Sequence, residues 1–285
     1  MLPFYTEIYQ DLFQPIIPVP LSAVPWKFVW IVTMVPSTPI KPSHYNAYAA
    51  VDPTLPQHST AGKTVVVVGG GQGIGAATAL AFAKSGAANL ALLGRTERTL
   101  SSTASKIEAE YVNTKVHTYV ADVTKKGTVE AAFEKLQQAA GPIDVLIYNS
   151  GYLPATKPMA VVDFDDWWNG YECNVKGAFN VLTSFKPAAA DNASVVNVSA
   201  AMAHMPAFPA MSGYVSSKLA SAKIFECFQR ENPQFQVVNT HPGVVATAMT
   251  DKSMAGVPPE IKKRVQMTDG KYGAGSNVWL GDCIR

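Results

Sequence analysis

Cysteine is scarce in this chain and its charges are nearly balanced, and both features argue against whole classes of protein. The three cysteines, Cys173, Cys227 and Cys283, lie far apart in the 285 residues and form no C-x-x-C pair. This spacing argues against a disulfide framework or a zinc site, so we expect no bound metal and a reducing compartment, the cytoplasm. With 23 Lys and Arg against 21 Asp and Glu, the net charge of +2 gives no basic field to attract a nucleic acid.

Glycine is absent from the first 60 residues, which hold ten of the 20 prolines. Because proline fixes φ and removes a backbone donor, no helix or central strand is expected to run far through this segment. Residues 1–60 are therefore predicted to form an irregular, proline-rich N-terminal arm.

The apolar segment of this arm is too short to cross a membrane. Its longest stretch without proline, residues 26–35, has ten residues, whereas a spanning helix needs ~20. Acidic Glu7 and Asp11 stand where a secretory signal would carry Lys or Arg, so no signal peptide is expected. Residues 24–35 are predicted to pack on the domain or on a second subunit, and an interfacial membrane contact is the alternative.

From residue 63 onward, short apolar runs alternate with segments of helical periodicity. The β-branched run at residues 64–68 predicts a strand buried on both faces, and the alanine-rich residues 74–85 predict a helix. Further strands are predicted at residues 90–93, 116–121, 143–148, 194–198 and 235–239. This order indicates an α/β fold with a doubly wound parallel sheet, in one domain over residues 61–285.

Glycines cluster in the turn between the first predicted strand and its helix. Gly69, Gly73, Ile74 and Gly75 belong to the run Gly-Gly-Gly-Gln-Gly-Ile-Gly. Glycine lets the backbone turn tightly and approach a pyrophosphate at a helix N-terminus, so this turn predicts a dinucleotide site. A glycine-rich turn without a ligand is the alternative.

The residues after the next two strands bear on the choice of cofactor. No acid follows the second strand, where an NAD site places one on the ribose 2′-hydroxyl. Gly94 leaves room there and Arg95 offers a planar cation suited to a 2′-phosphate, so NADP(H) is favoured over NAD(H), with a solvated Arg95 as the alternative. Asp122, after the third strand, is expected to accept from the adenine amino group or to lie near a helix N-cap.

Tyr214 and Lys218 begin a helical stretch, and their spacing places both side chains on one face, one turn apart. The ammonium stabilises a phenolate and lowers the Tyr pKa, and the phenol then gives a proton to a carbonyl oxygen or takes one from an alcohol. Alone, the spacing is common by chance and is typical of a solvated helix face.

The motifs as a set resemble the short-chain dehydrogenase/reductase family, whose fold is of the Rossmann type. The set comprises the glycine turn, Asn149-Ser-Gly151, Asn174, Tyr214-Val-Ser-Ser-Lys218 and Pro242-Gly-Val-Val-Ala-Thr247. Thr54-Leu-Pro-Gln-His58 and Ala203-His-Met-Pro206 are similar to members from filamentous fungi, which implies secondary metabolism.

The resemblance implies a role for each matching residue. Tyr214 would donate or accept the proton, Lys218 would hold the nicotinamide ribose, and Asn174 would keep a water in a proton relay. The cofactor would be lined by Asn149, Gly151, Asp122, Val123, Val245 and Thr247. A homo-oligomer is implied as well.

The sequence departs from the family pattern at the catalytic serine. The usual spacing before the Tyr falls on Ala201, and alignment on Asn197-Val-Ser199 places Ala200 there. Ser199 is the hydroxyl at that strand end, and we predict that it serves as the catalytic serine, with a local backbone bond as the alternative. The chain also ends soon after the sixth predicted strand, so we expect part of the family's usual C-terminal end to be missing.

Two functions remain open. The first is an NADP(H)-dependent oxidoreductase acting on a carbonyl or secondary alcohol of an apolar small molecule. The resemblance implies that residues 152–166 and 250–268 flank the pocket. They are rich in Met, Pro and Ala, and with Trp167, Trp168 and Met202 they predict an apolar pocket without an Arg cluster. The second is a protein that keeps this fold with weakened or lost redox activity and serves in ligand binding, non-redox catalysis or partner docking.

Overall fold

Six parallel strands form one sheet in the part of the chain that the structure describes, residues 48–205 and 209–255 of a computed structural model. These residues all belong to the unit Ile40–Arg285. The strands are β1 (Thr64–Val68), β2 (Asn89–Gly94), β3 (Lys115–Val120), β4 (Ile143–Tyr148), β5 (Ala189–Val198) and β6 (Gln236–Thr240). Their order in the sheet is β3-β2-β1-β4-β5-β6, and it confirms the predicted Rossmann-type doubly wound fold.

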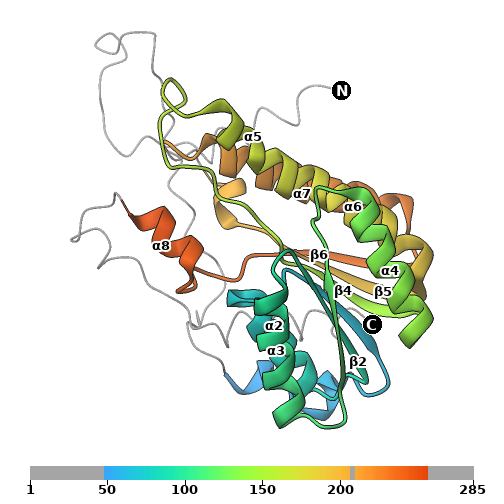
Figure 1. The fold of residues 1–285 in the computed structure, drawn as a ribbon. Coiled ribbons are helices and arrows are strands. Elements are labelled where there is room, and N and C mark those ends of the chain that lie inside the picture. Colours follow the sequence, from blue (N-terminus) through green and yellow to red (C-terminus); the bar gives the residue numbers. More distant parts are fainter. Residues whose placement is uncertain (1–47, 206–208, 256–285) are drawn as a thin grey trace, which may run out of the picture. The chain divides into compact units, whose positions relative to one another are not determined.

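Helices cover both faces of the sheet (Figure 1). They are α2 (Gly73–Lys84), α3 (Glu97–Glu110), α4 (Lys126–Ala140), α5 (Phe164–Tyr171), α6 (Gly177–Phe185), α7 (Ser212–Glu231) and α8 (Ala248–Met254). One buried cluster joins α4, α6 and α7 to the sheet, and a second joins α2 and α3 to its other face. All five residues of β1 are buried, because this central strand has helices on both sides.

The polar strand β5 is the element that the sequence predicted least well. The other strands and α2 lie within one residue of their predicted bounds, but β5 begins at Ala189 rather than at residue 194. Its first residues are small or polar and half-buried to exposed, so they lack the apolar run by which a buried strand is recognised.

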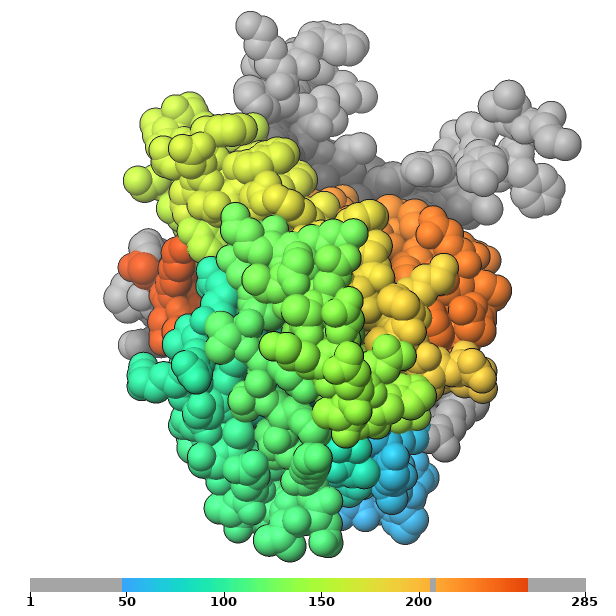
Figure 2. Space-filling view, turned by 45° about the vertical axis from the view of Figure 1, so that its right-hand side comes forward, coloured from blue at the N-terminus to red at the C-terminus, as the bar shows by residue number. Residues whose placement is uncertain are grey.

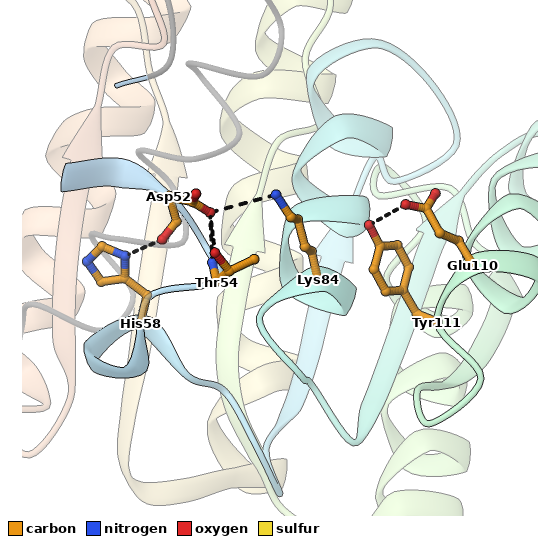
Figure 3. Close-up of polar contacts among 6 residues, drawn as sticks. All are labelled: Asp52, Thr54, His58, Lys84, Glu110 and Tyr111. Atoms are coloured by element: carbon orange, nitrogen blue, oxygen red, sulfur yellow. Dashed lines mark hydrogen bonds and ion pairs between the residues drawn. The ribbon is translucent and has the colours of Figure 1, made fainter. Parts of the chain in front are cut away.

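The last residues before β1 pack against the C-terminal end of α2 (Figure 3). They form two 3₁₀ turns, Ala49–Val51 and Pro56–His58. Asp52 accepts hydrogen bonds from Thr54 N and Oγ1 at 2.9 and 2.8 Å, and its carboxylate lies 3.7 Å from Lys84 Nζ. The buried His58 donates through Nδ1 to Asp52 O at 2.8 Å. This bond joins the second 3₁₀ turn, which contains His58, to the residue that follows the first turn.

The reversal of strand order between β1 and β4 determines where a ligand site is expected. In open parallel sheets, ligands bind at the carboxyl ends of the strands beside such a reversal. None of the described helices is both long and apolar enough to cross a bilayer. The structure does not describe the apolar segment 24–35 or the C-terminal residues 256–285. The predictions made for these two segments therefore concern residues outside the described ranges.

Candidate active site

The glycine turn folds tightly against its own helix. Gly69 and Gly73 have φ values of +83° and +56°, in the left-handed region that favours glycine. A Cβ on Gly75 would lie 2.0 Å from Gly69 O, so this position has no room for a side chain. The turn between β1 and α2 is therefore as tight, and as free of side chains at Gly75, as the glycine pattern predicted.

Two further features of this turn fit a dinucleotide phosphate. Gln72 precedes α2 in an extended conformation, and its side chain does not cap the helix, so the first N–H groups of α2 have no side-chain partner. A helix N-terminus of this kind favours an anion. Asn149, just after β4, joins the turn to the neighbouring strand, because its N–H donates to Val68 O at 3.0 Å and its Nδ2 to Gly69 O at 3.2 Å.

The residues expected to meet the adenosine half follow β2 and β3. Arg95 is exposed directly after β2, and its charge lies close enough to Tyr152 to counteract the rise in the pKa of that phenol. Asp122 Oδ1 accepts from Thr124 N and Oγ1 at 3.0 and 2.9 Å, in a local turn three residues before Lys125, the N-cap of α4. Val123 is buried beside Asp122, and its carbonyl accepts from α6.

The segment after β6 returns to the glycine turn. Thr247 caps α8 by accepting from Thr250 N at 3.3 Å, and its Cγ2 lies 3.5 Å from the position of a Cβ on Gly73. Val245 is buried, and its carbonyl accepts from Thr250 Oγ1 at 2.5 Å. The structure thus brings Val245 and Thr247 to the same end of the sheet as the glycines.

Tyr214 and Lys218 lie in the first two turns of α7, as their spacing predicted. Lys218 is buried, and its Nζ donates to Val198 O at 2.7 Å. Burial lowers the pKa of Lys218 to about 8 and raises the pKa of Tyr214 to about 12. The prediction that Lys218 lowers the Tyr214 pKa is therefore wrong for this structure, since burial determines the shift and the ammonium faces the end of β5.

Asn174 is buried within a π-helical segment, η4 (Glu172–Lys176), between α5 and α6. Its Oδ1 accepts from Tyr152 N at 2.8 Å, while Nδ2 donates to Tyr152 O at 3.0 Å and to Ser217 Oγ at 2.9 Å. Ser217 donates to Tyr214 O at 2.9 Å. The Asn174 side chain therefore links the loop after β4 to the turn that carries Tyr214.

Ser199 lies directly after β5, and its N–H donates to Thr240 O at 2.7 Å. Its hydroxyl is buried and makes no hydrogen bond to the described residues, so it is joined to neither Tyr214 nor Lys218. The predicted alternative, a local backbone bond, is not formed by this hydroxyl either. An unsatisfied buried hydroxyl of this kind is an exception in folded proteins, and this one would have to become exposed before a ligand oxygen could bind to it.

A narrow, mainly apolar crevice lies beside Tyr214, and in this structure it has no room for a free water molecule. The loop after β4, α5 and the start of α7 supply its walls, which consist of Leu153, Pro154, Ala155, Lys157, Val162, Trp167, Ala210, Met211, Ser212, Gly213 and Tyr214. Much of the loop predicted to flank the pocket, residues 152–166, therefore does so. Lys157 is the charged residue among the described lining.

The family follows from the chain's similarity to known proteins. The family model of short chain dehydrogenases matches residues 63–257, which include the glycine turn, Tyr214 and Lys218. This chain belongs to the short-chain dehydrogenase/reductase family. Members of this oxidoreductase family use an NAD(P)-type cofactor and act on small molecules, and the resemblance predicted from the motifs is confirmed.

Fungal relatives and solved structures agree with this assignment. A short chain dehydrogenase of Monascus purpureus is 29% identical over 248 residues, 85% of this chain and 82% of that protein. One of Aspergillus terreus is 33% identical over 226 residues, 77% of this chain and 48% of that protein. The fold matches a short chain dehydrogenase of Shigella flexneri with a TM-score of 0.73 at 21% identity, covering 84% and 93% of the two chains. An alcohol dehydrogenase of Thermococcus sibiricus, complexed with 5-hydroxy-NADP, has a TM-score of 0.67 at 26% identity, covering 76% and 89%.

No role was predicted from the sequence for three polar residues beside this dehydrogenase site: Tyr152, Asp166 and Ser217. Ser217 lies within the turn from Tyr214 to Lys218, so helical spacing alone would have placed it near the site. Asp166 had no such signal, because its loop partners lie 11 and 14 residues before it in the sequence.

Proposed function

We propose that this protein is an NADP(H)-dependent oxidoreductase that reduces a carbonyl, or oxidises a secondary alcohol, of an apolar small molecule. The observation that carries the proposal is the position of Tyr214. Its phenol lines an apolar crevice and belongs to the helix that also carries Lys218, at the sheet end that holds the glycine turn. A proton donor beside an apolar pocket is the arrangement that carbonyl reduction requires.

The cofactor would be held by residues already described at this sheet end. Gly69, Gly73, Ile74 and Gly75 would approach its pyrophosphate, and Arg95 supports NADP(H) over NAD(H) because an exposed guanidinium directly after β2 suits a 2′-phosphate. Asp122 and Val123 would meet the adenine, Asn149 and Gly151 would line the cofactor, and Val245 and Thr247 would meet the nicotinamide carboxamide. When bound, the cofactor supplies or accepts the hydride.

The chain's own residues would manage the proton and the substrate oxygen. A pKa of about 12 keeps the Tyr214 phenol protonated at neutral pH, so the proton to be donated is present, and a lower pKa in the complex with cofactor and substrate would ease its transfer to a carbonyl oxygen. Lys218 would hold the ribose from its buried position. Asn174 would hold the loop after β4 in place against α7 and would retain a relay water. Ser199 would offer its free hydroxyl to the substrate oxygen.

A second function has one specific observation in its favour. Ala200 and Ala201 occupy the positions of the family's catalytic serine, and the Ser199 hydroxyl is buried. A site without that donor would bind the dinucleotide with weakened or lost redox activity, and would serve ligand binding, non-redox catalysis or partner docking.

Binding and turnover together separate the two functions. Purified protein is titrated with NADPH and NADH and then assayed for hydride transfer against a panel of apolar ketones and alcohols, with Tyr214→Phe as the matched variant. Turnover that Tyr214→Phe abolishes, with NADPH binding retained, supports the oxidoreductase. Tight binding without turnover supports the second function, and no affinity for either dinucleotide refutes both.

Two properties of the whole protein belong to the same proposal. The family supports a homo-oligomer, and the wide spacing of the cysteines supports a reducing compartment such as the cytoplasm. Light scattering of the purified full chain tests the first property, and a monomeric mass would refute it.

A further inference from the structure

The carboxylate of Asp166 on α5 binds one loop with both of its oxygens. Oδ1 accepts a short hydrogen bond from Tyr152 Oη, and Oδ2 accepts from Ala155 N at 2.6 Å. These bonds, the one from Tyr152 first, lower the pKa of Asp166 and keep it ionised at neutral pH. Hydrogen bonds to a charged carboxylate are the strong ones, so this contact fixes the loop firmly.

The loop that Asp166 holds is one wall of the crevice. Residues 153–155 line the crevice, and they lie between the two partners of the carboxylate. The loop is also held from α8, where Lys252 Nζ donates to Leu153 O at 2.5 Å and lies 5.0 Å from the centre of the Tyr152 ring. Asp166 itself is anchored, since Asp163 caps α5 by accepting from Asp166 N at 2.9 Å.

The next residue of α5 holds the opposite wall. Trp167 Nε1 donates to Ser212 Oγ at 3.1 Å, one residue before Gly213 and two before Tyr214. A Cβ on Gly213 would lie 2.8 Å from Trp167 Cδ1, so the indole edge touches the backbone of α7. Trp167 also stacks on Tyr171 with ring centres 5.1 Å apart, which restricts its motion.

Consecutive residues of one helix therefore connect the two walls. Figure 2 shows the surface of this region (yellow-green) standing out above α8 (red) on the same side of the view. Because α5 is a single helix of eight residues, the distance between the loop and the start of α7 is expected to depend on these two side chains.

We propose that Asp166 is a positioning residue that, together with Trp167, sets the width of the substrate crevice and hence the size of the apolar carbonyl substrate that Tyr214 accepts. This inference rests on the proposed function, because it assigns the crevice to the substrate. Asp166 touches neither Tyr214 nor the glycine turn, so it is expected to act through the loop and to change KM for the substrate more than the affinity for NADPH.

The test compares Asp166→Ala and Tyr152→Phe with a matched control. Asp165→Asn removes a charge from the next residue, which is exposed on the same helix. Asp166→Ala is expected to raise KM for the best apolar ketone by about tenfold or more with a smaller change in kcat, since two hydrogen bonds to a charged group are lost. Tyr152→Phe removes one of the two bonds and is expected to have a smaller effect in the same direction.

A second readout does not require turnover. Amide hydrogen exchange of Tyr152, Leu153 and Ala155 is expected to accelerate in Asp166→Ala and to stay unchanged in Asp165→Asn, while the affinity for NADPH changes less than KM does. Unchanged KM together with unchanged exchange would overturn the proposal, as would a fall in kcat at constant KM. If the parent protein turns over no substrate, the proposed function fails, and faster exchange confined to Asp166→Ala still supports the positioning role.

Discussion

Lys218 Nζ donates to Val198 O at 2.7 Å and thereby joins the helix that carries Tyr214 to the end of β5. Both groups are buried, so an ammonium charge is held away from water by a single protein acceptor among the described residues. Burial of a charge costs stability unless it is fully compensated. Lys218 is therefore expected to be retained for function at the expense of stability.

Lys218→Met is expected to abolish turnover and to raise the free energy of unfolding at pH 7 by roughly 1–3 kcal/mol, because a buried charge is replaced by an apolar group of similar length. The folded pKa of about 8 lies below the ordinary lysine pKa of 10.5, so the unfolded chain binds the proton more tightly. Parent stability should therefore rise relative to the variant between about pH 8 and 10. Urea unfolding of both proteins between about pH 8 and 10 checks this prediction. If the free energy of unfolding has the same pH dependence in parent and variant, the prediction is wrong.

Gly75→Ala is expected to weaken NADPH binding and to destabilise the fold, because the new Cβ would lie 2.0 Å from Gly69 O. Forcing a methyl group into such a contact costs ~1–3 kcal/mol. Gly127→Ala is the control, since a Cβ there meets nothing within 4 Å. Thermal melting and NADPH titration of both variants check the prediction, which fails if Gly75→Ala behaves like the control.

Arg95→Ala is expected to weaken NADPH binding by about 10–100-fold while leaving NADH binding unchanged, since a guanidinium–phosphate contact is charge-assisted and the NADH ribose lacks that phosphate. Arg230→Ala, at the far end of α7, removes the same charge away from the site. Fluorescence titration with both dinucleotides checks this. Equal losses for NADPH and NADH would show that Arg95 does not select the 2′-phosphate.

Ser199→Ala is expected to lower kcat by about 10²-fold, the loss typical of one removed donor to a substrate oxygen. Its stability should stay the same, because the hydroxyl has no hydrogen-bond partner among the described residues. Steady-state kinetics and melting measure the two effects. If Ser199→Ala keeps the parent kcat while Ala200→Ser raises it, Ser199 is not the catalytic hydroxyl and the parent site lacks one.

The sequence predicted the elements whose cause is local. Strands such as β1 and β4 are continuous apolar runs because both faces of the sheet are covered, and their bounds were predicted within one residue. The glycine turn and the helical spacing of Tyr214 and Lys218 were equally readable, since each depends on a few adjacent residues.

The remaining features depend on contacts between distant segments. The start of β5 is polar and pairs only because β4 lies beside it, and the π-helical turn at Asn174 has no periodicity of its own. The direction of the Tyr214 pKa shift is set by burial, which the spacing of Tyr and Lys does not reveal. The partners of Asp166 likewise become neighbours only in the folded chain.

The absence of room at Gly75 has a consequence for how such a protein changes over evolution. Strand, turn and helix meet there backbone to backbone, so position 75 is expected to accept no residue larger than glycine. The crevice, by contrast, is walled by exchangeable side chains on a loop and a short helix. New substrate specificities are therefore expected to arise by mutation of the residues that line the crevice, while Gly75 is expected to be retained.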